Sequence, residues 1–150
     1  MFLNILVAVD GSPASDRALQ EAIDLARASN ARLTVMTVVP DLPGPALGPA
    51  GAAGFDLTPM IRETEREYTA VLRAAVERVP AEIHASEVLA HGRPASSIVK
   101  QVKEGHHDLV VMGSRGRGDV RSLLLGSESH AVLNTCRVAV LIVHAETRPD

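Results

Sequence analysis

Hydrophobic positions along the chain follow two different periods, and the two kinds of segment alternate. Short, almost continuous apolar runs are typical of strands in a parallel sheet that is covered on both faces. Between these runs, apolar residues recur every three or four positions, which indicates helices that bury one face. The predicted strands are residues 3–9, 33–39, 83–89, 108–112 and 138–143.

The ends of the predicted helices carry residues that suit those positions. Ser12 can cap the first helix, Pro13 fits its first turn and Asn30 can end it. Ser127 is expected to cap the last helix. The second helix is expected to bury one face, made of Ile61, Tyr68, Leu72, Ala75 and Val79.

This alternation predicts an α/β fold, with a mostly parallel sheet, right-handed crossovers and helices on both faces. A length of 150 residues is that of one ordinary domain, so residues 1–150 are expected to form a single domain. Residues 40–59 depart from the pattern because they are rich in Pro and Gly. We interpret this loop as a mobile insertion within the domain, with a lid over a ligand as the alternative.

Composition narrows the choice of partners. The chain is 46% hydrophobic and 22% charged, which is typical of a globular protein. It has one Tyr, two Phe, no Trp and a net charge of −3, so neither stacking platforms nor a basic surface for nucleic acid are expected. The apolar run at residues 3–9 is too short to span a membrane. Cys136 is the only cysteine, which fits a cytoplasmic location.

The strongest chemical signal is a glycine-rich segment that follows a predicted strand. Gly113 and Gly116 are followed, after nine residues, by Gly126 and Ser127 at the start of a helix. Glycines let a backbone approach an anion closely, and a helix N-terminus offers free N–H groups and a positive dipole end. The pattern therefore suits a phosphate, although the glycines could equally serve tight turns alone.

Two other phosphate-binding patterns do not fit the chain. Arg121 stands where the dinucleotide-binding pattern that would start at Gly116 requires a glycine. No Walker A run with a Lys before Ser or Thr is present in the sequence. Binding of NAD and a P-loop mechanism are therefore poor interpretations.

With this glycine spacing, the chain resembles the ATP-binding subgroup of a known family, the universal stress proteins. That subgroup carries Gly, two residues, Gly, nine residues, Gly and then Ser or Thr, which is the spacing just described. Residues 5–12 resemble the opening strand and loop of the family, and residues 92–98 its middle signature. Residues 138–143 resemble its closing strand, so the resemblance covers nearly the whole chain.

The resemblance implies a five-stranded parallel sheet of order 3-2-1-4-5, the adenine nucleotide alpha-hydrolase-like arrangement. Asp10 and Gly113 would then lie on either side of one crevice, where ligands bind in such sheets. It also implies nucleotide-binding roles. Ala8, Val9 and Asp10 would line the nucleoside pocket, Val38 would cover the adenine, Gly113 and Gly116 would approach the ribose and first phosphate, and Gly126, Ser127 and Ser129 would hold the outer phosphates.

Several polar residues allow two interpretations. Asp10 could bind the nucleoside, or a magnesium ion that travels with its phosphates, or it could cap the first helix. Arg115 could contact phosphate or a partner protein. Glu128 stands where the family usually has a small apolar residue, and its side chain is expected to point to solvent while its backbone N–H serves the ligand. His106 and His107 are interpreted as solvated turn residues.

The family resemblance leads to a ranked set of functions. The first hypothesis is a dimeric, ATP-binding regulatory module of the stress response. It implies a homodimer formed through the edge strand from Val138 to Val143, because family members pair that strand antiparallel. The alternatives are a slow ATPase or nucleotide-dependent phosphotransferase, and a nucleotide-free dimeric interaction protein. No catalytic residue is assigned, since nothing in the sequence fixes the geometry of the acidic residues.

Overall fold

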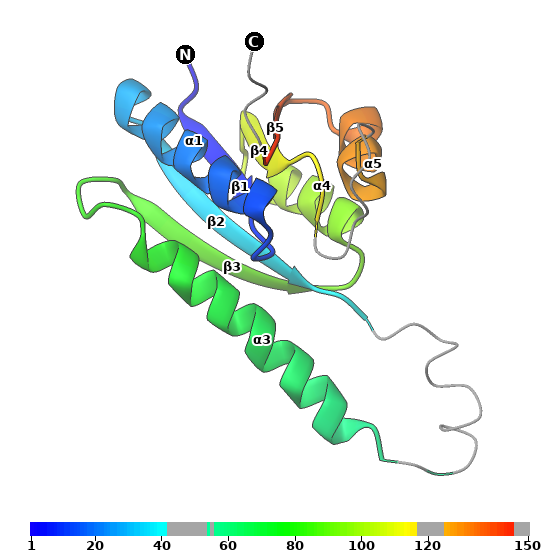
Figure 1. The fold of residues 1–150 in the computed structure, drawn as a ribbon. Coiled ribbons are helices and arrows are strands. Elements are labelled where there is room, and N and C mark those ends of the chain that lie inside the picture. The colour runs from blue at the N-terminus through cyan, green and yellow to red at the C-terminus, as the bar shows by residue number, and fades with distance from the viewer. Residues whose placement is uncertain (42–53, 55, 117–124, 146–150) are drawn as a thin grey trace.

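Strands and helices alternate along the chain in the computed structural model, which describes residues 1–41, 54, 56–116 and 125–145 (Figure 1). The loop at 40–59 lies largely outside the described residues, so its interpretation as an insertion or a lid stays a prediction. The elements are β1 (Asn4–Ala8), α1 (Pro13–Ser29), β2 (Arg32–Val39), α3 (Thr58–Glu77), β3 (Ala85–His91), α4 (Pro94–Glu104), β4 (Leu109–Gly113), α5 (Ser127–Thr135) and β5 (Ala139–Val143).

The five strands form one sheet of order β3-β2-β1-β4-β5, and every neighbouring pair is parallel. This confirms the α/β fold predicted from the alternation of elements and the strand order implied by the family resemblance. At the centre, Ile5 of β1 pairs with Leu33 of β2 on one side and with Leu109 of β4 on the other. The chain therefore winds in opposite directions from β1 and β4, and a crevice is expected beyond their carboxyl ends.

Helices cover both faces of the sheet, as predicted, and each face has its own hydrophobic core. Residues of α1 and α3 pack on one face with Ile5 and Val7 of β1. Residues of α4 and α5 pack on the other face with Leu6. Because side chains alternate along a strand, this double burial explains why β1 is apolar at consecutive positions. Figure 1 shows α3 along the β3 edge and α5 near β5.

Most predicted element boundaries hold, but one boundary and one buried face need correction. Pro13 is the first residue of α1, and Asn30 ends that helix in a left-handed conformation with φ of 54°. The third strand, however, runs from Ala85 to His91 rather than over 83–89. Its extent is set by pairing with β2, from Leu33 opposite Ala85 onward, which the sequence of β3 alone does not reveal.

The second correction concerns the buried face of α3. Leu72 and Ala75 are buried as expected, but Ile61 is 49% exposed. A helix of 20 residues is about 30 Å long, whereas the seven residues of β3 span about 23 Å. The first turns of α3 thus exceed the length of the neighbouring strand, and hydrophobic periodicity there does not lead to burial. Within the described residues, no helix is long and apolar enough to cross a membrane.

Candidate functional site

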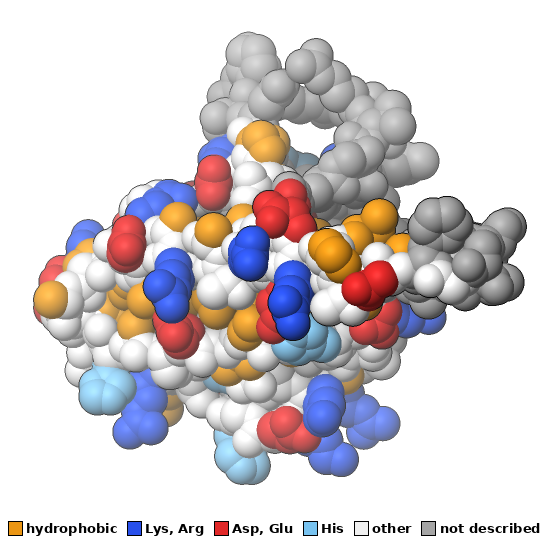
Figure 2. All heavy atoms as spheres, turned by 90° about the horizontal axis from the view of Figure 1, so that it is seen from below, with side chains coloured by type: hydrophobic (Ala, Val, Ile, Leu, Met, Phe, Trp, Pro, Cys, Tyr) orange, Lys and Arg blue, Asp and Glu red, His pale blue; other side chains and the backbone are white. Residues whose placement is uncertain are grey.

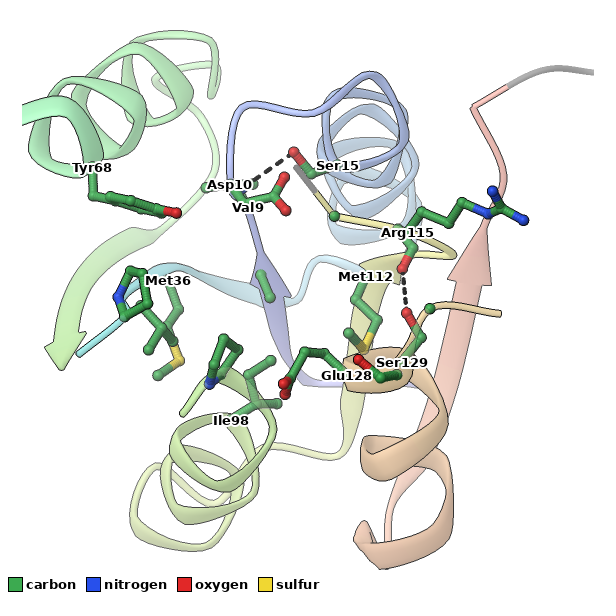
Figure 3. A pocket seen from close by; sticks show the side chains of 18 residues that line it. Val9, Asp10, Ser15, Met36, Tyr68, Ile98, Met112, Arg115, Glu128 and Ser129 are labelled. Carbon is green, nitrogen blue, oxygen red and sulfur yellow. Dashed lines mark hydrogen bonds between the residues drawn. The ribbon is translucent and has the colours of Figure 1, made fainter. Parts of the chain in front are cut away.

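A pocket opens where the carboxyl ends of β1, β2 and β4 meet the first turns of α4 and α5 (Figure 3). It encloses about 210 Å³. The structure brings together in its wall every residue that the sequence analysis assigned to nucleotide binding. These are Ala8, Val9, Asp10, Val38, Gly113, Arg115, Gly116, Gly126, Ser127, Glu128 and Ser129.

On one side of the pocket, the start of α1 is closed by its own side chains. The Ser12 hydroxyl accepts a hydrogen bond from Ser15 N at 3.2 Å, which makes Ser12 the cap of α1, as predicted. Asp10 Oδ1 accepts a hydrogen bond from Ser12 N at 2.9 Å, and Asp10 N donates to Ser15 Oγ at 3.2 Å. Asp10 therefore lines the pocket and braces the loop before α1, but the interpretation that it caps this helix was wrong, because Ser12 is the cap.

The first two motif glycines are sites of close approach. A Cβ on Gly113 would lie 2.7 Å from Ala14 Cβ and 2.9 Å from the Ala14 carbonyl carbon. Gly113 is thus required for β4 to pack against the start of α1, whatever its role toward a ligand. A Cβ on Gly116 would lie 2.7 Å from Asp10 Oδ2, so the loop after β4 crosses close to the end of β1.

The start of α5 differs from that of α1, because no side chain among the described residues caps it. Gly126 is the N-cap residue, with φ of −62° and ψ of 156°, and α5 begins at Ser127. The prediction that Ser127 caps this helix was therefore wrong by one residue. The first helical hydrogen bond runs from His130 N to Gly126 O at 3.0 Å. The N–H groups of Ser127, Glu128 and Ser129 come before it and have no acceptor within the helix.

Ser129 connects α5 to the glycine loop. Ser129 is 2% exposed, and its hydroxyl donates to the Gly113 carbonyl oxygen at 2.8 Å. The single hydroxyl proton is therefore used within the protein, and the backbone N–H of Ser129 is the donor left for a ligand. A bond from Gly126 N to Ser114 O at 2.7 Å fixes the same two segments to each other.

The side chain of Glu128 does not point to solvent, contrary to our expectation. Its Oε2 accepts a hydrogen bond of 2.7 Å from Ala95 N, in the first turn of α4, and Glu128 lines the pocket. In Figure 3 the Glu128 side chain extends from α5 toward Ile98 of α4. Helix α4 has no side-chain cap of its own at Arg93, and Pro94 has no N–H. The free N–H of Ala95 explains why the carboxylate turns inward.

The opposite part of the wall is largely apolar and was mostly missed by sequence reasoning. Met36 is missed although it lies two positions before Val38 and so on the same face of β2, a period-of-two signal that could have revealed it. Tyr68 of α3 was predicted to face inward, and it reaches the pocket from a distant part of the sequence (Figure 3). The lining residues that were not assigned to the site are Ser15, Met36, Pro40, Tyr68, Pro94, Ile98 and Met112.

At the far end of α4, His107 is a buried residue rather than the solvated turn residue we expected. It is 5% exposed, and its Nδ1 has no hydrogen-bond partner in the part of the chain that the structure describes. His106 adopts a left-handed backbone with φ of 53°, which reverses the chain and places the next ring against Gly105 and Gln101. Burial is the main reason why the pKa of His107 is lowered, although the Asn4 backbone and the Asp108 carboxylate oppose part of this effect.

Comparison with known proteins decides the family. The model of the universal stress protein family matches residues 1–144. The chain belongs to this family. The universal stress protein YxiE of Bacillus subtilis is 32% identical over 150 residues, which cover 94% of this chain and 99% of that protein.

Solved structures of other universal stress proteins share the fold. The protein UspA from Lactobacillus plantarum matches with a TM-score of 0.78 and 25% identity, over 94% of this chain and 97% of that one. A universal stress protein in complex with cAMP matches with a TM-score of 0.68 and 29% identity, over 97% and 98% of the two chains. One from Archaeoglobus fulgidus in complex with dAMP matches with a TM-score of 0.68 and 22% identity, over 94% and 97%. Relatives in this family therefore bind adenine nucleotides.

Proposed function

We propose that this universal stress protein binds ATP and acts as a dimeric regulatory module of the stress response. The observation that carries the proposal is the start of α5, which presents backbone N–H groups beside the glycine loop in the central crevice. Such a helix start favours phosphate by geometry and by charge. The complexes of two relatives with adenine nucleotides support the same ligand class.

The pocket offers different surroundings to the two ends of a nucleotide. Its apolar part, with Met36, Val38 and Ile98, suits a flat base. Its polar part, at Gly126 and Ser127, suits phosphates. We propose that the adenine lies over the end of β2 and that the phosphates lie at the start of α5. The Asp10 carboxylate, at the end of β1 between them, then faces the ribose.

A magnesium ion is part of the proposal only as a companion of the phosphates. Within the described residues, no group of three or more His, Cys, Asp or Glu side chains could hold a metal. Asp10 lines the pocket and accepts a backbone hydrogen bond through Oδ1, so it fits as a single carboxylate ligand. Magnesium commonly binds in this way, through one carboxylate, substrate phosphates and water.

The dimer part of the proposal rests on the edge of the sheet. β5 lies at the end of the strand order, so one of its sides offers backbone groups to a second copy. Leu141 of β5 is 36% exposed and Leu133 of α5 is 40% exposed, which gives this edge an apolar character. We further propose that residues 1–150 form a single domain. A cytoplasmic location, expected from the lone Cys136, stays a prediction.

Ligand binding is tested by thermal unfolding with ATP, ADP, AMP, cAMP and GTP, each with and without magnesium. A ligand at a hundredfold excess over its Kd adds about 2.7 kcal/mol, which corresponds to roughly 5–11 °C in Tm for a chain of this size. We expect the largest shift with ATP. A larger shift with cAMP would overturn the choice of ATP. No shift with any nucleotide, together with no nucleotide released on denaturation, would overturn the whole proposal.

The chain provides its own reporter for binding in the pocket. Tyr68 lines the pocket, and it is the only Tyr in a sequence without Trp. We expect ATP to change the fluorescence of Tyr68, and no Trp emission is present to mask this change. Tyr68→Phe removes the signal, and calorimetry with this variant shows whether binding itself continues. ATP turnover in the same samples tests the alternative of a slow ATPase.

The dimer is tested by sedimentation or by light scattering on a sizing column. The expected mass is twice the 15.9 kDa of one chain. Leu141→Lys places a charge on the β5 edge and is expected to shift the population to monomer, while Leu3→Lys, a control at another exposed leucine, is expected to stay dimeric. A wild-type mass of one chain would overturn this part of the proposal and leave nucleotide binding untouched.

A further inference from the structure

Three helices begin around the pocket, and a single carboxylate determines which of them can receive an anion. The start of α1 is closed by Ser12. The start of α4 has no side-chain cap of its own, and its first helical bond runs from Ser97 N to Arg93 O. The N–H of Ala95 therefore has no acceptor within the helix, and it donates a hydrogen bond of 2.7 Å to Glu128 Oε2.

Without Glu128, the first turn of α4 would be a second anion-binding position in the same pocket. Pro94 and Ile98, both on α4, line the pocket together with Ser127 and Ser129 of α5. Both helices direct a positive dipole end toward this space. Glu128 fills the α4 position with its own negative charge, so it removes one attractive site and adds one repulsive charge.

We propose that Glu128 is a specificity-determining residue that filters ligands by charge. Its carboxylate keeps phosphates away from α4 and confines them to the start of α5, and it penalises each further negative charge on the ligand. Metal-free ATP is therefore penalised most, and an uncharged nucleoside least. This inference rests on the proposed nucleotide site, but it adds a selection among nucleotides that the site alone does not imply.

The test separates the charge of Glu128 from its shape. Glu128→Gln keeps an oxygen that can accept the Ala95 hydrogen bond but removes the charge. Glu128→Asp keeps the charge on a shorter side chain. Glu21→Gln, at an exposed position eight residues along α1 from Pro13, removes one negative charge about 12 Å along the helix axis from that start. Circular dichroism and Tm establish that each variant is folded.

Binding of adenosine, AMP, ADP and ATP is measured by calorimetry in EDTA at an ionic strength of about 0.15 M, where the Debye length is about 8 Å. For Glu128→Gln we expect the affinity ratio of ATP to adenosine to rise about tenfold over wild type, because a unit charge a few ångströms away acts on each phosphate. We expect AMP and ADP to fall between these limits. Glu128→Asp is expected to keep the wild-type ratio within about twofold, because it keeps the charge in the pocket. Glu21→Gln is expected to do the same, because a surface charge beyond the Debye length is largely screened.

The outcomes distinguish this inference from the proposed function. If wild type binds none of the four ligands, the nucleotide site itself is wrong. If wild type binds ATP but Glu128→Gln changes all four affinities equally, Glu128 is only a structural cap of α4 and the charge filter is wrong. If Glu128→Gln does not fold, Glu128→Val provides the same comparison of ligands without the charge.

Discussion

Helices α1 and α5 begin beyond the carboxyl ends of two strands that are neighbours in the sheet, yet their N-termini are capped differently. At α1, Ser12 caps the helix and Asp10 braces the turn before it. At α5, the equivalent position is Gly126, which has no side chain to offer. One helix start is therefore completed by side chains of its own loop, whereas the other has no side-chain cap among the described residues.

This contrast teaches that a helix N-terminus is not by itself a binding site. Every helix has an N-terminus, and the N-termini of α1, α4 and α5 lie at the same pocket. The helices differ in the group that accepts hydrogen bonds from the backbone N–H groups of the first turn. At α1 the acceptor is a side chain of the preceding loop, and at α4 it is a carboxylate from another helix. At α5 the N-cap residue is a glycine, which has no side chain to accept one. The distinction depends on a few residues, so we expect single substitutions to reverse it.

The largest expected effect comes from closing α5 in the manner of α1. Gly126 has φ of −62° and ψ of 156°, a conformation that any residue can adopt, so Gly126→Asp can place a carboxylate over the first turn. Like charges at a binding site cost several kcal/mol, so we expect ATP affinity to fall by about 100-fold or more. Gly126→Ala is the matched control without a charge. Unchanged ATP affinity in Gly126→Asp would show that phosphates do not bind at α5.

The next effect concerns the packing of β4 against the start of α1. Gly113→Ala would place a methyl group 2.7 Å from Ala14 Cβ, where β4 meets α1. Overpacking of this kind costs about 1–3 kcal/mol of unfolding free energy, which urea denaturation measures. Gly126→Ala serves again as the comparison. A Gly113→Ala variant as stable as wild type would mean that the motif glycine is not needed for packing.

A smaller effect is expected when the cap of α1 is removed. Ser12→Ala leaves Ser15 N without its acceptor, and loss of a serine cap costs about 1 kcal/mol. For a chain of this length we expect a fall in Tm of about 2–4 °C. Ser96→Ala is the matched control, since Ser96 is exposed and its hydroxyl donates to Arg93 O rather than capping a helix. Equal falls in the two variants would contradict a specific capping role.

The smallest effect is expected at the other end of α4, away from the pocket. The folded-state pKa of His107 lies below its unfolded value, so the unfolded chain takes up this proton first as pH falls. Its contribution to stability is complete above about pH 6.5 and is lost as pH falls below that value toward the folded-state pKa. We expect this loss between pH 7.5 and 5.5 to diminish in His107→Gln but not in His130→Gln. Equal pH dependence in all three proteins would contradict this assignment.

Much of the fold could be predicted from the sequence, because local patterns are enough to place most elements. The apolar runs of the strands, Pro13 at the start of α1 and Asn30 at its end are confirmed. The nucleotide-binding residues assigned through the family resemblance all line one pocket, which makes their roles testable as a group. Their contact with a nucleotide stays a prediction.

Local sequence patterns were enough to predict the alternation of elements, the two-sided burial of the central strands and the glycine spacing, because each depends on residues close together in the chain. Features that depend on distant partners became visible in the folded structure alone. It turned Glu128 inward, because the free N–H of Ala95 lies within its reach. It buried His107 beneath a left-handed turn, and it left Ile61 exposed on a helix longer than its neighbouring strand. Hydrogen-bond partners and burial are set by packing between segments, and local periodicity carries no record of either.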